Sequence, residues 1–489
     1  MHYSSTRGLR GAVSSSAAIA QGIASDGGLF VPGEIPTLMA EDLCELKKLS
    51  YQETAKKILA LYLDDYSEQE ISECVDSAYV NFDTDEIVPV LKLSDDLYTA
   101  ELWHGPTSAF KDVALQLLPH LMKTAVKKNG IKDDILILTA TSGDTGKAAL
   151  EGFKDVDGTH VVVYYPHNGV SDIQYLQMAT QEGINTDVIA VEGNFDDTQA
   201  GVKWIFTDDK IADKMRKKHY RFSSANSINL GRLLPQIVYY FTSYLKVMDE
   251  ESVAAKEYVD FVVPTGNFGN ILAGFYAKRM GLPIGKLICA SNSNKILFDF
   301  LETGEYDTNR EFKKTISPSM DIIISSNFER LLFEASKGDS EFVSRLQSEL
   351  KNGGQYNVSE TFLFKIRKSF DGGWADEKET KEQIKKIWAK YGYLIDPHTA
   401  VGFAVLDKIK DSGNKKIVLS TANPYKFTSV VLEALTGNST GDGFRDMEEL
   451  SSMTGTVAPK TLAELKDKKV LHKTVCSKDK MAKTLMKMI

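Results

Sequence analysis

The spacing of hydrophobic residues divides the chain into regions with different periods. Up to about residue 95, apolar residues recur three and four positions apart over 51–63 and 68–79, which predicts amphipathic helices. From about residue 96, short runs that are apolar at every position alternate with helical stretches. Such runs are typical of strands covered by helices on both faces, so they predict parallel, doubly wound sheets. The predicted strands are Ile135–Leu138, Val161–Tyr165, Val188–Val191, Phe261–Val263, Leu287–Ala290 and Ile417–Leu419.

The same patterns divide the 489 residues into three parts. We expect an N-terminal domain over residues 1–95, a core of two α/β subdomains over 96–435, and a C-terminal tail over 436–489. A polar, charged stretch at about 335–393 has helical periodicity and is interpreted as a helical insertion in the core. The basic end of the tail predicts either a helix or a partly disordered segment. The Ser-rich N-terminus has the composition of a transit peptide, but we interpret it as part of the folded protein.

Composition narrows the class of protein. The net charge of −9 and the pI of about 5.6 argue against bulk nucleic-acid binding, which needs a basic surface. No apolar run approaches the roughly 20 residues of a membrane span. The four cysteines form no C-x-x-C pair, which indicates neither a metal site nor a disulfide framework. We therefore expect a cytoplasmic protein whose partner is a small molecule, with no nucleic acid, membrane or metal.

Lys111 is the most informative single residue. It directly precedes a stretch in which Ala114, Leu115, Leu118 and further apolar residues recur at helical spacing, so it lies at or near a helix start. Unpaired N–H groups leave partial positive charge there, which is unfavourable for a cation. A lysine that must act as a neutral amine and form a Schiff base with an aldehyde instead benefits from a lowered pKa.

Four unusual loops follow predicted strands, where open α/β sheets bind their ligands. Lys111 lies in the first, HGPTSAFKD (104–112). The second is TSGDTG (141–146), the third PTGNFGN (264–270) and the fourth STANPYKF (420–427). The glycines of the third loop let the backbone approach an anion, and the N–H groups of the next helix then point at it. There is no G-x-G-x-x-G and no P-loop spacing, so neither a dinucleotide nor ATP is favoured.

A cofactor with both an aldehyde and a phosphate fits these loops, and pyridoxal 5′-phosphate has both. Lys111 is the predicted aldehyde partner, and the hydroxyl of Thr421 is a candidate partner of the pyridine nitrogen. A hydroxyl does not hold that nitrogen protonated as an aspartate does, which suits eliminations and replacements. The predicted phosphate ligands are Gly266, Asn267, Phe268, Gly269 and Asn270.

The four loop motifs, together with SSANSINLGRLLPQ (223–236), resemble the threonine synthase family in sequence and in order. YSSTRG and SDGGLFVP near the start fit its longer bacterial and fungal branch, and the similarity extends from about residue 3 to 430. The resemblance implies the second fold type of pyridoxal-phosphate enzymes, that of tryptophan synthase β. Two open doubly wound sheets with an added N-terminal domain are then expected. Wider relatives such as cysteine synthase carry Asn where this chain has Asp144, and we count Asp144 among the cofactor-binding residues.

The resemblance also implies an activity. It is a carbon–oxygen lyase reaction in which O-phospho-L-homoserine and water give L-threonine and phosphate, the last step of threonine biosynthesis. Lys111 is the expected catalytic residue. Candidates for the substrate carboxylate are Thr141, Ser142, Gly143 and Thr145, and candidates for the substrate phosphate are Asn226, Asn229 and Arg232.

Several alternatives stay open. Arg232 is otherwise a surface ion pair, and His104 and His398 are equally well explained as hydrogen-bonded structural residues. Another enzyme of the same chemistry would release a 2-oxo acid, either as a phospho-lyase or as a threonine or serine dehydratase. A non-enzymatic binding protein on the same scaffold is disfavoured by the intact Lys111. The oligomeric state, monomer or homodimer, is open.

Overall fold

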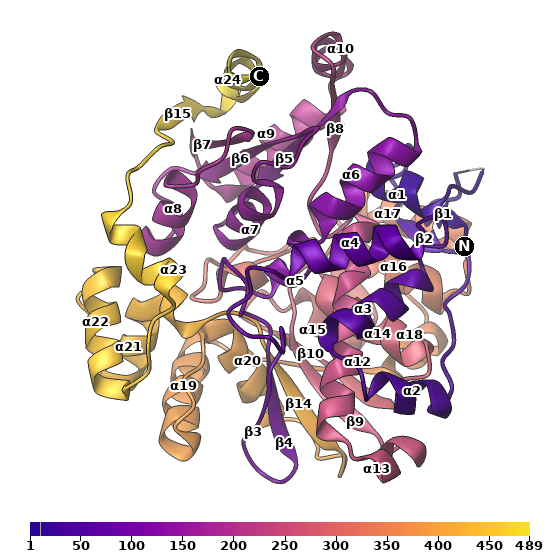
Figure 1. Ribbon diagram of the computed structural model, residues 1–489. Helices are drawn as coiled ribbons and strands as arrows, with labels where there is room; N and C mark the ends of the chain where they lie inside the picture. Colours follow the sequence, from indigo (N-terminus) through magenta and orange to yellow (C-terminus); the bar gives the residue numbers. More distant parts are fainter. Residues whose placement is uncertain (10) are drawn as a thin grey trace.

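The computed structural model of the protein describes residues 1–9 and 11–489. Two sheets, each flanked by helices, make up its centre, and Figure 1 shows the smaller sheet above the larger one. All six predicted runs fall inside strands, because residues apolar on both faces are stable only when helices cover both sides of a sheet. The prediction of two doubly wound sheets is confirmed.

The larger sheet has six strands in the order β13-β10-β9-β14-β4-β3. All neighbouring pairs are parallel except β3 and β4, which are antiparallel. Its strands are β3 (Val90–Lys92), β4 (Leu97–Glu101), β9 (Val259–Pro264), β10 (Ile284–Ser291), β13 (Phe370–Trp374) and β14 (Lys415–Ser420).

The smaller sheet has five strands, all parallel, in the order β15-β7-β6-β5-β8. They are β5 (Asp134–Ala140), β6 (Thr159–Pro166), β7 (Thr186–Glu192), β8 (Tyr220–Ser223) and β15 (Thr474–Ser477). Two short antiparallel pairs lie outside both sheets, β1 (Tyr3–Ser5) with β2 (Phe30–Pro32), and β11 (Glu305–Asp307) with β12 (Gln355–Asn357).

The N-terminal helices pack on the core, with α3 against α12 and α1 against α6. The helices up to residue 128 are α1 (Ser15–Gln21), α2 (Ala40–Leu46), α3 (Tyr51–Ala60), α4 (Glu68–Ala78), α5 (Lys111–Leu115) and α6 (Leu118–Lys128). The smaller sheet is covered by α7 (Asp144–Phe153), α8 (Asp172–Ala179), α9 (Phe195–Thr207) and α10 (Asp209–Lys217).

The remaining helices surround the larger sheet or lie in the tail. From residue 230 to 335 they are α11 (Leu230–Leu233), α12 (Pro235–Val247), α13 (Glu250–Ala254), α14 (Gly269–Arg279), α15 (Ile296–Thr303), η1 (Pro318–Met320) and α16 (Phe328–Ala335). Further along are α17 (Ser340–Gly353), α18 (Glu360–Arg367), α19 (Glu377–Tyr391), α20 (Pro397–Leu406), η2 (Pro424–Phe427) and α21 (Thr428–Thr436). The tail has α22 (Gly443–Thr454), α23 (Lys460–Ala463), η3 (Glu464–Asp467), η4 (Lys478–Lys480) and α24 (Met481–Met488).

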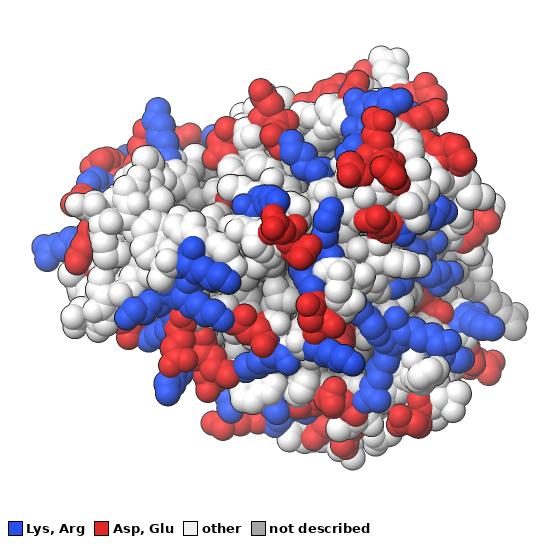
Figure 2. Space-filling model, turned by 90° about the horizontal axis from the view of Figure 1, so that it is seen from below, with Lys and Arg blue, Asp and Glu red and all other residues white. Residues whose placement is uncertain are grey.

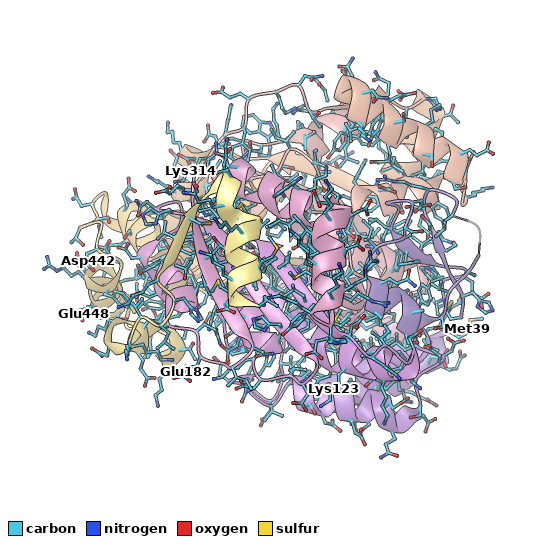
Figure 3. The ribbon with its side chains drawn as sticks, turned by 90° about the horizontal axis from the view of Figure 1, so that it is seen from above. Met39, Lys123, Glu182, Lys314, Asp442 and Glu448 are labelled. Atoms are coloured by element: carbon cyan, nitrogen blue, oxygen red, sulfur yellow. The ribbon has the colours of Figure 1, made fainter. Side chains whose placement is uncertain are left out.

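The structure differs from the expected domain plan at three places. The stretch 335–393 is not only helical, because its strand β13 pairs in parallel with β10 at the edge of the larger sheet. The tail, expected to end in a helix or in partial disorder, supplies the edge strand β15 as well as α24, which packs on α9 (Figure 3). The boundary at residue 95 separates β3 from its antiparallel partner β4. Edge strands are short and half exposed, so they lack the continuous apolar run that identifies central strands.

Two general features of the molecule are the distribution of charge on its surface and the composition of its helices. Lysines and arginines are interspersed with aspartates and glutamates over the face seen in Figure 2. Across residues 1–9 and 11–489, no helix has both the length and the apolar composition that crossing a membrane requires.

Candidate active site

The site is formed where loops from both sheets meet. Strands β4, β9 and β14 of the larger sheet lead into the lysine, PTGNFGN and STANPYKF loops, and β5 of the smaller sheet leads into TSGDTG. Direct backbone pairing joins the first and last of the larger sheet's loops, because Phe110 N–H donates to Thr421 O at 2.8 Å and Ala109 bridges Ala422. Helix α5, which begins at Lys111, lies between the two sheets (Figure 1).

Lys111 is buried, and its side chain meets the smaller sheet's loop. Its Nζ donates to Ser319 Oγ at 3.0 Å and lies 3.7 Å from Asp144 Oδ2. Burial lowers the pKa of Lys111 to about 8; Lys426 and Arg232 add to this lowering, and Asp144 opposes it. Lys111 lies at a helix start, as its sequence position predicts, but the main cause of its lowered pKa is desolvation. An amine with a pKa near 8 is partly neutral at physiological pH, as a nucleophile must be.

Asp144, the first residue of α7, holds the centre of the site. Its Oδ1 is 2.8 Å from the Nζ of Lys426, a lysine with no exposed surface. Its Oδ2 accepts the hydroxyl of Ser319 at 3.0 Å. Burial alone would raise the pKa of Asp144, but Lys426 and Lys111 outweigh it and hold the pKa well below its usual range. Asp144 is therefore an ionised carboxylate beside the reactive amine.

Ser319 is held by a histidine whose tautomer follows from its contacts. The backbone N–H of Ser319 donates to His398 Nε2 at 3.1 Å, so that nitrogen is an acceptor. His398 Nδ1 lies 2.7 Å from Oδ1 of Asp396, the N-cap of α20, and donates to it. His398 is thus a buried residue that orients the Ser319 segment over the site. His104 instead lies between Asp83 and Glu101; burial would lower its pKa, but these two carboxylates raise it, as expected for a structural histidine.

The PTGNFGN loop has the features of an anion site. None of the backbone N–H groups of residues 266–270 donates to an acceptor within the described chain. Phe268, the N-cap of α14, has a left-handed backbone with φ of 62°, which is costly for an aromatic residue. Its ring packs on Phe328 and Phe370 in the core, so Phe268 contributes its backbone to the loop and not its side chain. At Gly266, a Cβ would lie 2.5 Å from Ser319 O. Five free N–H groups before a helix fit a phosphate monoester.

The residues therefore fit pyridoxal phosphate. Residues 266–270 would hold its phosphate, Lys111 would bind its aldehyde carbon, and Thr421 would face its ring nitrogen. Thr421 is buried, and its hydroxyl makes no hydrogen bond to another described residue, although its N–H donates to Thr399 Oγ1 at 3.1 Å.

The TSGDTG loop is shaped by its own first residue. The hydroxyl oxygen of Thr141 accepts the N–H groups of Gly143 and Gly146 at 3.0 and 2.9 Å. Gly143 has φ of 133°, and a Cβ there would collide with Gln174 at 2.4 Å, so only glycine fits. Ser142 and Thr145 are half-buried. Of the predicted carboxylate ligands, Thr141 has an evident structural role.

In the segment after β8, the three predicted phosphate ligands have different surroundings. Asn229 is fully buried as the N-cap of α11, and its amide bonds Gly231 N–H, Ile19 O and Ser224 O. Both of its amide hydrogens are used, so it has no donor left for a phosphate, and we revise its expected role to a structural one. Asn226 is half-buried. Arg232 is buried and donates through Nη1 to Ala225 O at 2.9 Å. Its Nε has no partner among the described residues.

The surface ion pair considered for Arg232 is therefore wrong. Only 4% of its surface is exposed, and no carboxylate in the described chain lies within 4 Å of it. Burial lowers its pKa to about 10, and its charge contributes to the lowered pKa of Lys111. A buried guanidinium with spare donors beside the reactive lysine is suited to an anionic ligand.

A second buried arginine connects the site to the N-terminal domain. Arg330 donates to Phe30 O of β2 at 3.0 Å, to Ile228 O at 2.7 Å and to Asn327 Oδ1. Asn327 in turn donates to Asn267 O of the PTGNFGN loop. The neighbouring Glu329 accepts two hydrogen bonds from Arg7 and one from Thr6. Ser319, Lys426, Asn327 and Arg330 were not identified from the sequence as site residues.

A two-sheet, doubly wound fold with a desolvated lysine after one strand and a glycine-rich loop with free N–H groups after another is typical of pyridoxal-phosphate enzymes of the second fold type. The family model described as "Pyridoxal-phosphate dependent enzyme" matches residues 87–349. "Threonine synthase N terminus" matches residues 2–79, and "Threonine synthase, C-terminal" matches residues 399–482. The chain belongs to the threonine synthase family. The predicted resemblance and the predicted cofactor are thereby confirmed.

Individual proteins with similar sequences or structures support this family assignment. A threonine synthase from Schizosaccharomyces pombe is 41% identical over 469 residues, covering 89% of this chain and 90% of that protein. Threonine synthase-like 1 from Macaca fascicularis is 40% identical over 431 residues, covering 86% of this chain. The chain spans only 58% of the length of that relative. A crystal structure described as threonine synthase with bound PLP, from Brucella melitensis, is 39% identical with a TM-score of 0.89, covering 100% of this chain and 98% of that one.

Proposed function

We propose that the protein is a threonine synthase that converts O-phospho-L-homoserine and water into L-threonine and phosphate. One observation carries the proposal: two separate anion-binding features flank Lys111. The free N–H groups of residues 266–270 suit the cofactor phosphate, and the unpaired donors of Arg232 suit a second phosphate. A dehydratase of free threonine or serine needs only the first of these.

The charges around Lys111 also favour a doubly anionic substrate. The cations Lys426 and Arg232 and the carboxylate Asp144 act on its amine. Lys426 is paired with Asp144, whereas the buried guanidinium of Arg232 has no carboxylate within 4 Å in the described chain. An excess of buried positive charge is costly unless a ligand brings negative charge. A phosphorylated amino acid brings a phosphate and a carboxylate to such a site.

The residues have distinct tasks in this reaction. Bound pyridoxal phosphate supplies an electron sink next to the substrate Cα. Lys111, as a neutral amine, removes the Cα proton and can return protons to the substrate during the later steps. Loss of a Cβ proton would expel the γ-phosphate; a proton would then be added at Cγ and water at Cβ, which gives the methyl and hydroxyl groups of threonine. Arg232 and Asn226 would bind the phosphate before and after it departs, and Ser142 and Thr145 would bind the carboxylate.

The product identifies the enzyme. Protein, pyridoxal phosphate and O-phosphohomoserine are mixed, and the carbon product is identified by mass spectrometry. We expect threonine with one phosphate released per turnover. Mostly 2-oxobutyrate would indicate a phospho-lyase, and a preference for free threonine or serine would indicate a dehydratase; either result would overturn the proposal.

We further propose a cytoplasmic location, on the ground of four cysteines without paired spacing. The monomeric and homodimeric alternatives are separated by measuring the mass in solution.

A further inference from the structure

Lys426 is a buried cation that the reaction above does not use. It lies in η2, within the STANPYKF loop that follows β14, and none of its side chain is exposed. Its Nζ bonds Asp144 Oδ1 at 2.8 Å and Thr107 O, in the lysine loop, at 2.9 Å. The side chain therefore connects three of the four strand-end loops: its own, the lysine loop and TSGDTG.

A buried ion pair such as Lys426–Asp144 is energetically costly. Moving two charges out of water costs more than their attraction usually returns, and a neutral pair of similar shape is often more stable. An asparagine at position 144 and an apolar residue at 426 would fill the same space without charge. The pair therefore calls for a reason beyond stability.

The second oxygen of Asp144 suggests that reason. Oδ2 accepts the Ser319 hydroxyl at 3.0 Å and lies 3.7 Å from the amine of Lys111, which itself donates to Ser319. The carboxylate is held from its other side by Lys426 and by Gln174, whose amide donates to Oδ1 at 3.2 Å. An ionised Asp144 without Lys426 would have Lys111 as its nearest cation and would favour the protonated amine.

We propose that Lys426 is a positioning residue that neutralises and orients Asp144, so that this carboxylate arranges Ser319 and Lys111 without keeping the Lys111 amine protonated. The inference rests on the proposed function because it takes Lys111 as the reacting amine. The charges facing the Lys111 amine support it: Asp144 raises the pKa of Lys111, whereas Lys426 and Arg232 lower it. His398 also lies close enough to act on Asp144, and the buried carboxyl of Asp112 interacts with Lys426.

The test measures the Lys111 amine and not turnover. Full-length protein is mixed with pyridoxal phosphate over a range of pH, treated with borohydride, and the fraction of chains carrying trapped cofactor at Lys111 is measured by mass spectrometry. In Lys426→Met we expect the midpoint of capture to move up by about one pH unit, or about tenfold less capture on the acidic side. In Asp144→Asn the midpoint should move down, because the carboxylate that raises the pKa of Lys111 is removed while Lys426 keeps its charge.

The double variant Lys426→Met/Asp144→Asn is the decisive arm. If the two side chains act as a pair, it should capture the cofactor with a midpoint near that of the wild type and should fold even where Lys426→Met alone does not. Lys147→Met is the matched control, because Lys147 is a mostly buried lysine of α7 paired with Glu151 at 2.8 Å, and its midpoint should be unchanged. A wild-type midpoint in Lys426→Met, or a double variant no better than Lys426→Met, would overturn the proposal. Failure of the proposed function would appear separately, as a product other than threonine with these midpoints unaltered.

Discussion

Arg232 and Arg330 are both buried, and burial lowers the pKa of each to about 10, yet their surroundings differ. Arg330 uses all three guanidinium nitrogens, each on an oxygen from a different segment. Arg232 donates to a single carbonyl, and its Nε has no acceptor within residues 1–9 and 11–489. The fully bonded arginine holds the structure together, whereas the incompletely bonded one is the arginine that we propose binds a ligand.

The two arginines are also connected. Arg330 donates to Ile228 O, in the segment that carries Arg232, and reaches Asn267 of the phosphate loop through Asn327. The N-terminal domain enters this network through Phe30 and, at the neighbouring Glu329, through Arg7. The N-terminal domain thus contacts the segments that carry both proposed anion-binding features. Burial is the same for the two arginines, and what differs between them is the number of satisfied donors.

The largest expected effect is on stability. Arg330→Met leaves two buried acceptors and one partly buried acceptor without their donor, at about 1–3 kcal/mol each. We expect a loss of roughly 3–5 kcal/mol in the free energy of unfolding, with weaker cofactor binding in the protein that folds. Chemical denaturation measures it, and Arg232→Met should lose less than about 1 kcal/mol. Equal losses in the two variants would remove the distinction between them.

Lys111, like Arg232, is a buried cation that we propose binds a ligand. The pH dependence of the free energy of unfolding tests whether its pKa is lowered. The unfolded lysine keeps its proton up to pH about 10.5, whereas the folded amine loses it near 8. Between these values the unfolded state binds more protons, so the free energy of unfolding of the cofactor-free protein should rise with pH, by at most about 3 kcal/mol. The comparison is made with Lys111→Met, in which this contribution should vanish. Identical pH profiles would show that the amine is not perturbed.

Measurements of activity test whether Arg232 binds the substrate phosphate. Arg232→Ala should lower kcat/KM for O-phosphohomoserine by roughly 1.5–3 kcal/mol, the contribution of a charged hydrogen bond. Side reactions on unphosphorylated threonine or serine should hardly change, because those substrates lack the phosphate. Arg279→Ala is the control, since that arginine is exposed and pairs with Glu334. An equal loss on both kinds of substrate would remove Arg232 from the phosphate site.

The smallest expected effect concerns the phosphate loop, whose N–H groups are unsatisfied like those of Arg232. A Cβ at Gly269 meets only ordinary contacts, at 3.4 Å from Ser227 Cβ and 3.5 Å from Asn327 Nδ2. Gly269→Ala should therefore keep its affinity for pyridoxal phosphate. Gly269→Asp adds a like charge and should weaken cofactor affinity by about tenfold or more, measured by titration of the cofactor-free protein. Unchanged affinity in folded Gly269→Asp would place the cofactor phosphate elsewhere.

Much of the fold could be predicted from the sequence. Val161–Tyr165 and Phe261–Val263 were identified because an uninterrupted apolar run needs cover on both faces, a property visible within a few residues. The edge strands β13 and β15 were not identified. Phe370–Trp374 contains two glycines and Thr474–Ser477 has one buried residue, so what makes each a strand is the open edge of a distant neighbour.

The same division holds for the site. The sequence by itself determined where Lys111, the phosphate loop and Thr421 stand, because helix starts, glycine-rich turns and strand ends are local features of the backbone. Only the tertiary structure decided that Asn229 is a cap while Arg232 keeps free donors. It alone brought Ser319 to Asp144, 175 residues away, and paired Asp144 with Lys426. The physical reason is that charge pairing and burial act between neighbours in space, and local sequence signals do not specify which distant residues become neighbours.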